Sequence, residues 1–88
     1  MNWKIKIEST AAKELKKLDK VARQRIERFI DQLACEANPR SRGIALQGEA
    51  YDGLWRYRVG DYRLICQIKD KEVLILILEI GHRKAIYR

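Results

Sequence analysis

The chain has 88 residues, a formal charge of +7 and a pI near 9.7, which leaves room for one small domain and excludes a second. Hydrophobic residues make up 47% of it and charged residues 35%, a balance that is typical of a folded domain and excludes a disordered chain. So large a positive charge favours a polyanionic partner, whether nucleic acid, an acidic protein or an anionic membrane surface, and charge alone does not choose among them.

A strand and two helices are expected first along the chain. Alternation of polar and apolar residues over 2–7 predicts a strand with one buried face. Apolar residues at helical spacing then predict a short helix, capped by Ser9 or Thr10, and a second helix capped by Asp19. The second helix is expected to run as far as Pro39, because the residue before a proline avoids helical backbone angles. These segments predict a helical hairpin.

Basic side chains cover the outer faces of this helical hairpin. Most of them are expected to form an ordinary solvated surface, because runs of charge on helices usually do. A subset, for which Lys16 and Lys17 are the candidates, has the charge to follow a phosphate backbone.

The segment that joins the helices to the rest of the chain has no sustained period. Residues 39–53, PRSRGIALQGEAYDG, carry three glycines and predict an ordered connecting loop. Ile44 and Leu46 are expected to anchor this loop to the core, because they are its aliphatic residues of core size.

Residues 54–68, LWRYRVGDYRLICQI, carry the clearest pattern in the sequence. Two alternating runs flank Gly60 and Asp61, which predicts a tight β-hairpin because glycine supplies the positive φ of a primed turn. The register then places Val59 opposite Tyr62, and directly opposed residues share a face. The further pairs expected are Arg58 with Arg63, Tyr57 with Leu64, Arg56 with Ile65, and Trp55 with Cys66.

The two faces of this predicted hairpin differ in chemistry. One is apolar and holds Trp55, Tyr57, Val59, Tyr62, Leu64, Cys66 and Ile68. The other gathers Arg56, Arg58 and Arg63. Like charges opposed across a ladder destabilise it, so we expect the three arginines to bind a polyanion rather than to stabilise the sheet.

A continuous aliphatic run over 72–80, EVLILILEI, predicts an interior strand that is buried on both faces. Its alternation places Leu74, Leu76 and Leu78, with Ile65, on the face away from the helices, where the C-terminal segment or a partner must cover them. The predicted fold class is α+β, with an N-terminal strand and a helical hairpin packed on a twisted, mainly antiparallel four-stranded sheet. Residues 1–88 are expected to form a single domain.

The antiparallel return of the last strand brings its end beside the hairpin turn. His82 and Arg83 are therefore expected close to Arg58 and Arg63, with Tyr87 within reach. Four stretches that are separate in sequence would thus supply one cluster at one end of the sheet.

Such a cluster suits phosphodiester chemistry better than metal chemistry. The chain has one histidine and no cysteine-histidine motif, phosphate-binding glycine loop or carboxylate pattern spaced for a metal, so we expect no metal and no cofactor. Guanidiniums bind phosphate oxygens and stabilise the charge of a pentavalent transition state. In RNA the 2′-hydroxyl can attack the adjacent phosphorus once a base removes its proton. Tyr87 is a candidate base if neighbouring cations lower its pKa, and His82 is a competing acid or base.

The cysteines and the apolar segments indicate the compartment. Cys35 and Cys66 are the only cysteines and lie far apart, so we expect buried thiols in a reducing environment rather than a disulfide. The N-terminus, MNWKIKIES, has no uninterrupted apolar segment for secretion, and no run approaches the roughly 20 apolar residues of a membrane span. A cytoplasmic protein without membrane contact is expected.

Four stretches together resemble the RelE branch of the RelE/ParE toxin superfamily: PRSRG at 39–43, LQG at 46–48, GLWRYRVGDYRLI at 53–65 and GHRKAIYR at 81–88. The resemblance implies a bacterial or archaeal toxin that cleaves mRNA in the A site of the small ribosomal subunit, next to 16S rRNA. It also implies a cognate antitoxin, RelB-like or other, that is encoded nearby and holds the toxin inactive.

The resemblance also assigns residues. The two basic residues of the family's first hairpin strand, often lysines, fall on Arg56 and Arg58, which would bind RNA. The catalytic arginines fall on Arg63 and Arg83, and the C-terminal tyrosine falls on Tyr87. The ParE branch, which acts on DNA gyrase without cutting RNA, shares the fold and is the principal alternative. An inactive RNA- or partner-binding module of the same fold is a third.

Overall fold

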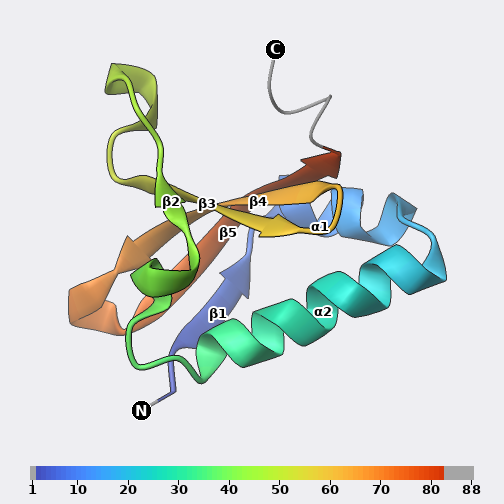
Figure 1. Cartoon of the computed structure of the whole chain (residues 1–88), viewed down its shortest axis with the longest axis horizontal. Helices are drawn as coiled ribbons and strands as arrows, with labels where there is room; N and C mark the ends of the chain where they lie inside the picture. The colour runs from blue at the N-terminus through green and yellow to red at the C-terminus, as the bar shows by residue number, and fades with distance from the viewer. Residues whose placement is uncertain (1, 83–88) are drawn as a thin grey trace.

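Two helices lie against one face of a five-stranded sheet in the computed structural model, which describes residues 2–82 (Figure 1). The strands and helices, in chain order, are β1 (Lys4–Ile7), α1 (Ser9–Lys17), α2 (Lys20–Ala34), β2 (Ile44–Ala45), β3 (Leu54–Val59), β4 (Tyr62–Lys69) and β5 (Leu74–His82). Short 3-10 helices occupy three of the connections: η1 (Pro39–Arg42), η2 (Glu49–Tyr51) and η3 (Asp70–Glu72). The predicted α+β class is confirmed.

The sheet has the strand order β1-β5-β4-β3-β2. β1 pairs with β5 in parallel, and every other neighbouring pair is antiparallel. The strand that the sequence did not predict is β2, which pairs Ile44 with Arg56 and Ala45 with Trp55 inside the segment expected to be a loop. A strand of two residues has no period to detect. Ile44 is 57% exposed, so its expected role as a core anchor is wrong.

Helix α2 begins directly after Asp19, as predicted, but ends at Ala34, several residues before Pro39. The Ala34 carbonyl accepts a hydrogen bond of 2.7 Å from the Trp3 amide, so the end of α2 is held against the residue that precedes β1. Cys35 follows the helix and is exposed, so only one of the two expected buried thiols is found. Both cysteines are free, as expected.

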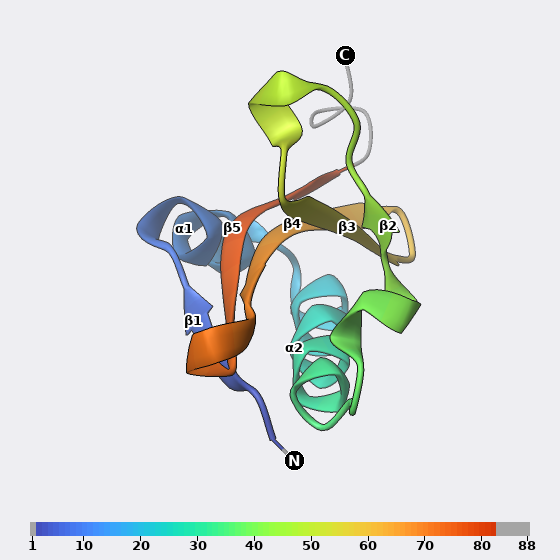
Figure 2. The same cartoon turned by 90° about the vertical axis from the view of Figure 1, so that its left-hand side faces the viewer.

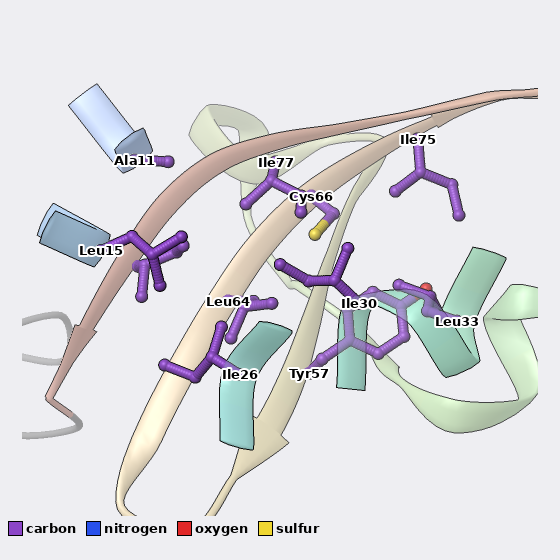
Figure 3. Packing of buried hydrophobic residues seen from close by; sticks show 11 residues of the cluster. Ala11, Leu15, Ile26, Ile30, Leu33, Tyr57, Leu64, Cys66, Ile75 and Ile77 are labelled. Atoms are coloured by element: carbon purple, nitrogen blue, oxygen red, sulfur yellow. The ribbon is translucent and has the colours of Figure 1, made fainter. Parts of the chain in front are cut away.

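One apolar core fills the space between the helices and the sheet (Figure 3). The helices contribute Ala11, Leu15, Ile26, Ile30 and Leu33, and the sheet contributes Tyr57, Leu64, Cys66, Ile75, Ile77 and Ile80. In Figure 3 the Cys66 sulfur lies among these aliphatic side chains. Burial raises the pKa of its thiol to about 12, because the thiolate would lose its hydration.

A β-bulge interrupts the pairing of β4 with β5. Cys66 pairs with Ile77 and Ile65 pairs with Glu79, so Leu78 is an extra residue on β5. The extra residue reverses the alternation beyond it, and Ile80, which pairs with Leu64, faces the helices.

The outer face of β5 is less exposed than expected. Four aliphatic residues were expected there as a strip in need of a cover. Instead, Ile65 and Leu76 are only 3% and 9% exposed, and Leu74 and Leu78 are half-buried. The expected protein-binding strip is therefore not an exposed surface of this fold.

Candidate nucleic-acid interface

The β3–β4 hairpin has the predicted register. Arg58 pairs with Arg63, Arg56 pairs with Ile65, and Val59 pairs with Tyr62. Gly60 has a φ of +60°, the left-handed conformation that a tight hairpin turn requires and glycine adopts without strain. Because directly opposed residues share a face, Arg56, Arg58 and Arg63 lie on the side of the sheet that faces away from the helices. We call this side the arginine face.

The three arginines lie at different depths. Arg58 is exposed, Arg56 is half-buried, and Arg63 is only 5% exposed. The Nη1 atom of Arg63 donates to the carbonyl oxygen of Tyr62 over 3.4 Å. A guanidinium held this deeply has little rotamer freedom left, so its positive charge is fixed in position. The sequence pattern indicated the shared face but not the burial of Arg63.

A hollow of about 280 Å³ lies beside the arginine face and is lined by Arg42, Gly43, Ile44, Arg56 and Arg58. We call it the β2 groove. It brings Arg42, which the sequence analysis did not select, next to two arginines that it did. The signal was present in the PRSRG stretch, but Arg42 could be placed only once β2 was known to pair with β3.

Segment η1, which precedes β2, is tied to the sheet at several points. The Tyr57 hydroxyl donates to the Pro39 carbonyl over 2.9 Å inside the protein. Arg40 binds both carboxylate oxygens of Asp70, at 2.8 and 2.6 Å, and its guanidinium lies 5.8 Å from the centre of the Trp55 ring. These contacts fix the wall of the β2 groove against β3.

His82 reaches the predicted end of the sheet but lies on the other face. It pairs with Tyr62, and the two rings meet edge to face at 5.6 Å between centroids. Gly81, and not His82, is the residue opposite Arg63. The physical reason is the bulge at Leu78, because the extra residue moves His82 from the arginine face to the side that carries the helices. His82 therefore lies at the same end of the sheet as Arg58 and Arg63, as expected, but on the opposite face.

Other predicted site residues fall elsewhere. Lys16 and Lys17 are exposed in the last turn of α1, where Lys17 lies 3.7 Å from Glu14. Helix α1 lies beside β5 in Figure 2 and shares the core with α2 through Ala11 and Leu15, so these lysines are not part of the arginine face. Arg83 and Tyr87 lie outside the described residues.

The arginine face and the β2 groove carry cationic side chains and, in the described part of the chain, no group suited to a metal. Among residues 2–82, no group of three or more histidine, cysteine, aspartate and glutamate side chains could hold a metal ion. The arginine face and the β2 groove instead offer guanidiniums at several depths, which suit the oxygens of a phosphate backbone.

No helix within the described part of the chain is both long and apolar enough to cross a membrane.

The comparisons with known proteins agree on one group of proteins. The family described as ParE toxin of type II toxin-antitoxin system, parDE, matches residues 5–87. A protein of Escherichia coli described as RelE-like toxin protein is 27% identical over 84 residues, which cover 96% of this chain and 86% of that protein.

Two solved structures add to this. The chain resembles a structure of the archaeal RelE-RelB complex from Pyrococcus horikoshii, with a TM-score of 0.77 and 34% identity over 94% of this chain and 97% of that chain. It also resembles a structure of the toxin-antitoxin complex RelBE2 from Mycobacterium tuberculosis, with a TM-score of 0.72 and 28% identity over 94% of this chain and 100% of that chain.

Proposed function

Because this chain belongs to the RelE/ParE family of toxins of type II toxin-antitoxin systems, we propose that it is an endoribonuclease that cleaves mRNA in the ribosomal A site and so arrests translation. The observation that carries the proposal is the arginine face, where Arg58 lies directly opposite the buried Arg63. Guanidiniums gathered on one face offer a phosphodiester several charge-assisted hydrogen bonds, which is why the arginine face supports this substrate.

The proposed roles follow the depths of the arginines. Arg56 and Arg58, the more accessible pair, orient the mRNA backbone. Arg63 stabilises the negative charge that grows on the phosphorane, because a fixed donor acts best on charge that develops only in the transition state. Arg83 is proposed to assist it.

The reaction needs no added nucleophile and no metal. Tyr87 takes the proton of the 2′-hydroxyl, the 2′-oxygen bonds to phosphorus, and the bond from phosphorus to the 5′-oxygen breaks. The products are a cyclic 2′,3′-phosphate and a 5′-hydroxyl. The proton on the 5′-oxygen comes from water, and Arg83 assists the leaving oxygen with its positive charge. We assign no acid role to His82, because it faces Tyr62 on the opposite side of the sheet.

Ribosome dependence is consistent with so small a site. A few side chains can bind RNA without fixing the reacting 2′-hydroxyl and phosphate in the geometry for attack. The ribosome supplies this positioning, which converts a slow reaction into a fast one. Lys16 and Lys17, on α1, are proposed to contact RNA outside the reacting nucleotide, such as 16S rRNA. A cognate antitoxin is proposed to restrain the free toxin, since the solved relatives include complexes of RelE with RelB.

The test is a translation assay with ribosomes programmed with a defined mRNA, in which 5′ ends are mapped after the toxin is added. Cuts in the A site are expected with the wild type and are expected to disappear with Arg63→Ala. Because Arg63 is buried, Arg63→Lys and a circular dichroism spectrum of each variant separate a lost charge from a lost fold. Lys71→Ala, in the exposed turn η3, is the control.

Inhibition of DNA gyrase is the second candidate, and the match to the ParE toxin family favours it. A supercoiling assay with purified gyrase decides between the two. Poisoned gyrase with intact mRNA would assign the protein to the ParE branch, and no effect in either assay would indicate an inactive binding module.

A further inference from the structure

We propose that the β2 groove is a subsite for one nucleotide of single-stranded RNA beside the reacting phosphate, in which Arg42 and Arg58 bind a phosphate and Ile44 packs against the base or ribose. The inference rests on the proposed RNA substrate and adds a site that the family assignment does not supply. It makes Arg42 an RNA-binding residue although Arg42 lies on η1, outside the hairpin that carries the proposed reaction.

Arg42 is positioned by two groups that approach it from the α2 side. Its Nη1 atom donates to the Glu36 carboxylate over 3.0 Å, and its guanidinium lies 5.3 Å from the centre of the Phe29 ring. The Arg42 side chain is still 37% exposed and that of Glu36 is 32% exposed, so solvent weakens the ion pair. A guanidinium held in this way is fixed at the groove wall yet able to exchange a carboxylate for a phosphate.

Ile44 supplies the apolar part of the subsite. It is opposite Arg56 in the β2–β3 ladder, so its side chain shares the arginine face, and it is one of the large hydrophobic residues that are exposed. An aliphatic side chain among guanidiniums matches a nucleotide, which joins a flat apolar base to a charged phosphate. The carboxylates of an acidic peptide match the arginines alone, whereas each nucleotide joins a phosphate for the arginines to a base that packs on Ile44.

Contacts within the protein hold the walls of the groove. A Cβ atom on Gly43 would lie 2.8 Å from the Tyr57 ring and 2.9 Å from the Arg56 carbonyl oxygen, so β2 approaches β3 as closely as the backbone permits. Together with the anchored η1, this close approach keeps Arg42 and Ile44 at the groove without further ordering, which lowers the entropy lost on binding.

The experiment measures binding of a fluorescein-labelled single-stranded RNA oligonucleotide to the purified full chain by anisotropy, at several salt concentrations. Arg42→Gln is expected to weaken binding by about tenfold and to flatten the salt dependence by about 0.7 in log–log slope, as loss of one phosphate contact does. Lys6→Gln removes the same charge from β1, at the opposite edge of the sheet, and is expected to change affinity far less.

Two further variants separate a binding role from a structural one. Glu36→Gln frees the Arg42 guanidinium from its carboxylate partner and removes a nearby negative charge, so it is expected to tighten RNA binding. Glu27→Gln, at an exposed position of α2, makes the same change in charge away from the groove and is the control. Ile44→Ser is expected to weaken binding while the salt slope stays the same, because the lost contact is apolar. Opposite signs for Arg42→Gln and Glu36→Gln cannot arise from a shared loss of stability.

Equal effects of Arg42→Gln and Lys6→Gln, or a loss of affinity with Glu36→Gln, would overturn the subsite. So would an acidic peptide that binds at least as tightly as RNA and is equally sensitive to Arg42→Gln, since the groove would then belong to a protein partner. Free RNA binding requires neither ribosome nor cleavage. Failure here, with A-site cuts still present, therefore rejects the subsite and leaves the proposed function intact.

Discussion

Arg40 and Asp70 form a two-pronged ion pair that joins two distant parts of the chain. The Nη1 and Nη2 atoms of Arg40 lie 2.8 and 2.6 Å from the two carboxylate oxygens of Asp70. Arg40 belongs to η1, which leads into β2, and Asp70 begins η3, the connection of β4 to β5. The pair therefore holds the wall of the β2 groove to the end of the sheet that lies away from the hairpin turn.

This pair predicts a loss of stability in acid. Hydrogen bonding from Arg40 lowers the pKa of Asp70 below its ordinary value of 3.8. A depressed pKa contributes stability above the unfolded value and loses it as the pH falls through the folded value. Asp70→Asn is thus expected to reduce the urea midpoint near neutral pH, with the difference from wild type shrinking below about pH 4. A difference that stays constant with pH would show that the pair does not act through this carboxylate.

Cys66 predicts a loss of stability in alkali. Its pKa is raised by burial from 9.0 to about 12, so its stabilising effect is full below pH 9.0 and declines as the pH rises toward the folded value. The unfolding free energy of the wild type is expected to fall by about 1 kcal/mol more than that of Cys66→Ala between about pH 9 and about pH 10. The measurement is urea unfolding under reducing conditions, and parallel curves for the two proteins would contradict the prediction.

Gly43→Ala is expected to destabilise the fold by about 1–3 kcal/mol, because the new methyl group would overlap the Tyr57 ring and the Arg56 carbonyl. Denaturant unfolding measures the loss. Ala45→Ser, at an exposed position of β2 two residues later, is the matched control and is expected to change stability little. Wild-type stability in Gly43→Ala would mean that β2 moves away from β3 without penalty.

Val73 has a φ of +50°, which is a left-handed conformation that β-branched residues rarely adopt. Asparagine tolerates this conformation, so Val73→Asn is expected to raise the unfolding free energy by about 0.5–1 kcal/mol. Val21→Asn, on the exposed surface of α2, makes the same chemical change where no such strain exists and is expected to give no gain. Thermal unfolding of the two variants compares them directly.

A substitution of His82 tests whether this residue takes part in cleavage. Because the bulge turns it toward Tyr62, His82→Phe is expected to keep A-site cleavage close to the wild-type rate, and the aromatic contact is preserved. The rate is taken from the mapped 5′ ends over time, with Tyr62→Phe as a control for the ring pair. A large loss of cleavage in His82→Phe would restore His82 as an acid or base.

The sequence by itself determined the hairpin and the helical layer. Apolar residues alternate with polar ones on both sides of Gly60 and Asp61, and only one strand register buries all of these apolar residues. A slip of one residue in the pairing of β3 with β4 would turn the apolar residues of the slipped strand to the other face. The grouping of Arg56, Arg58 and Arg63 on one face follows from that register alone. The two helices follow equally from local spacing, apart from the end of α2 and the start of α1. Glu8, and not Ser9 or Thr10, occupies the cap position of α1, so that expected cap is wrong.

Only the tertiary structure decided which residues join the arginines. Strand β2 is too short to have a period, and it forms because Gly43 allows its backbone to approach Tyr57, which places Arg42 in the β2 groove. The bulge at Leu78 has no signature in an unbroken aliphatic run, yet it decides that His82 faces the helices. The depth of Arg63 likewise depends on what packs around it and not on its neighbours in sequence. Local patterns fix faces and registers, whereas long-range packing fixes burial and the meeting of separate segments.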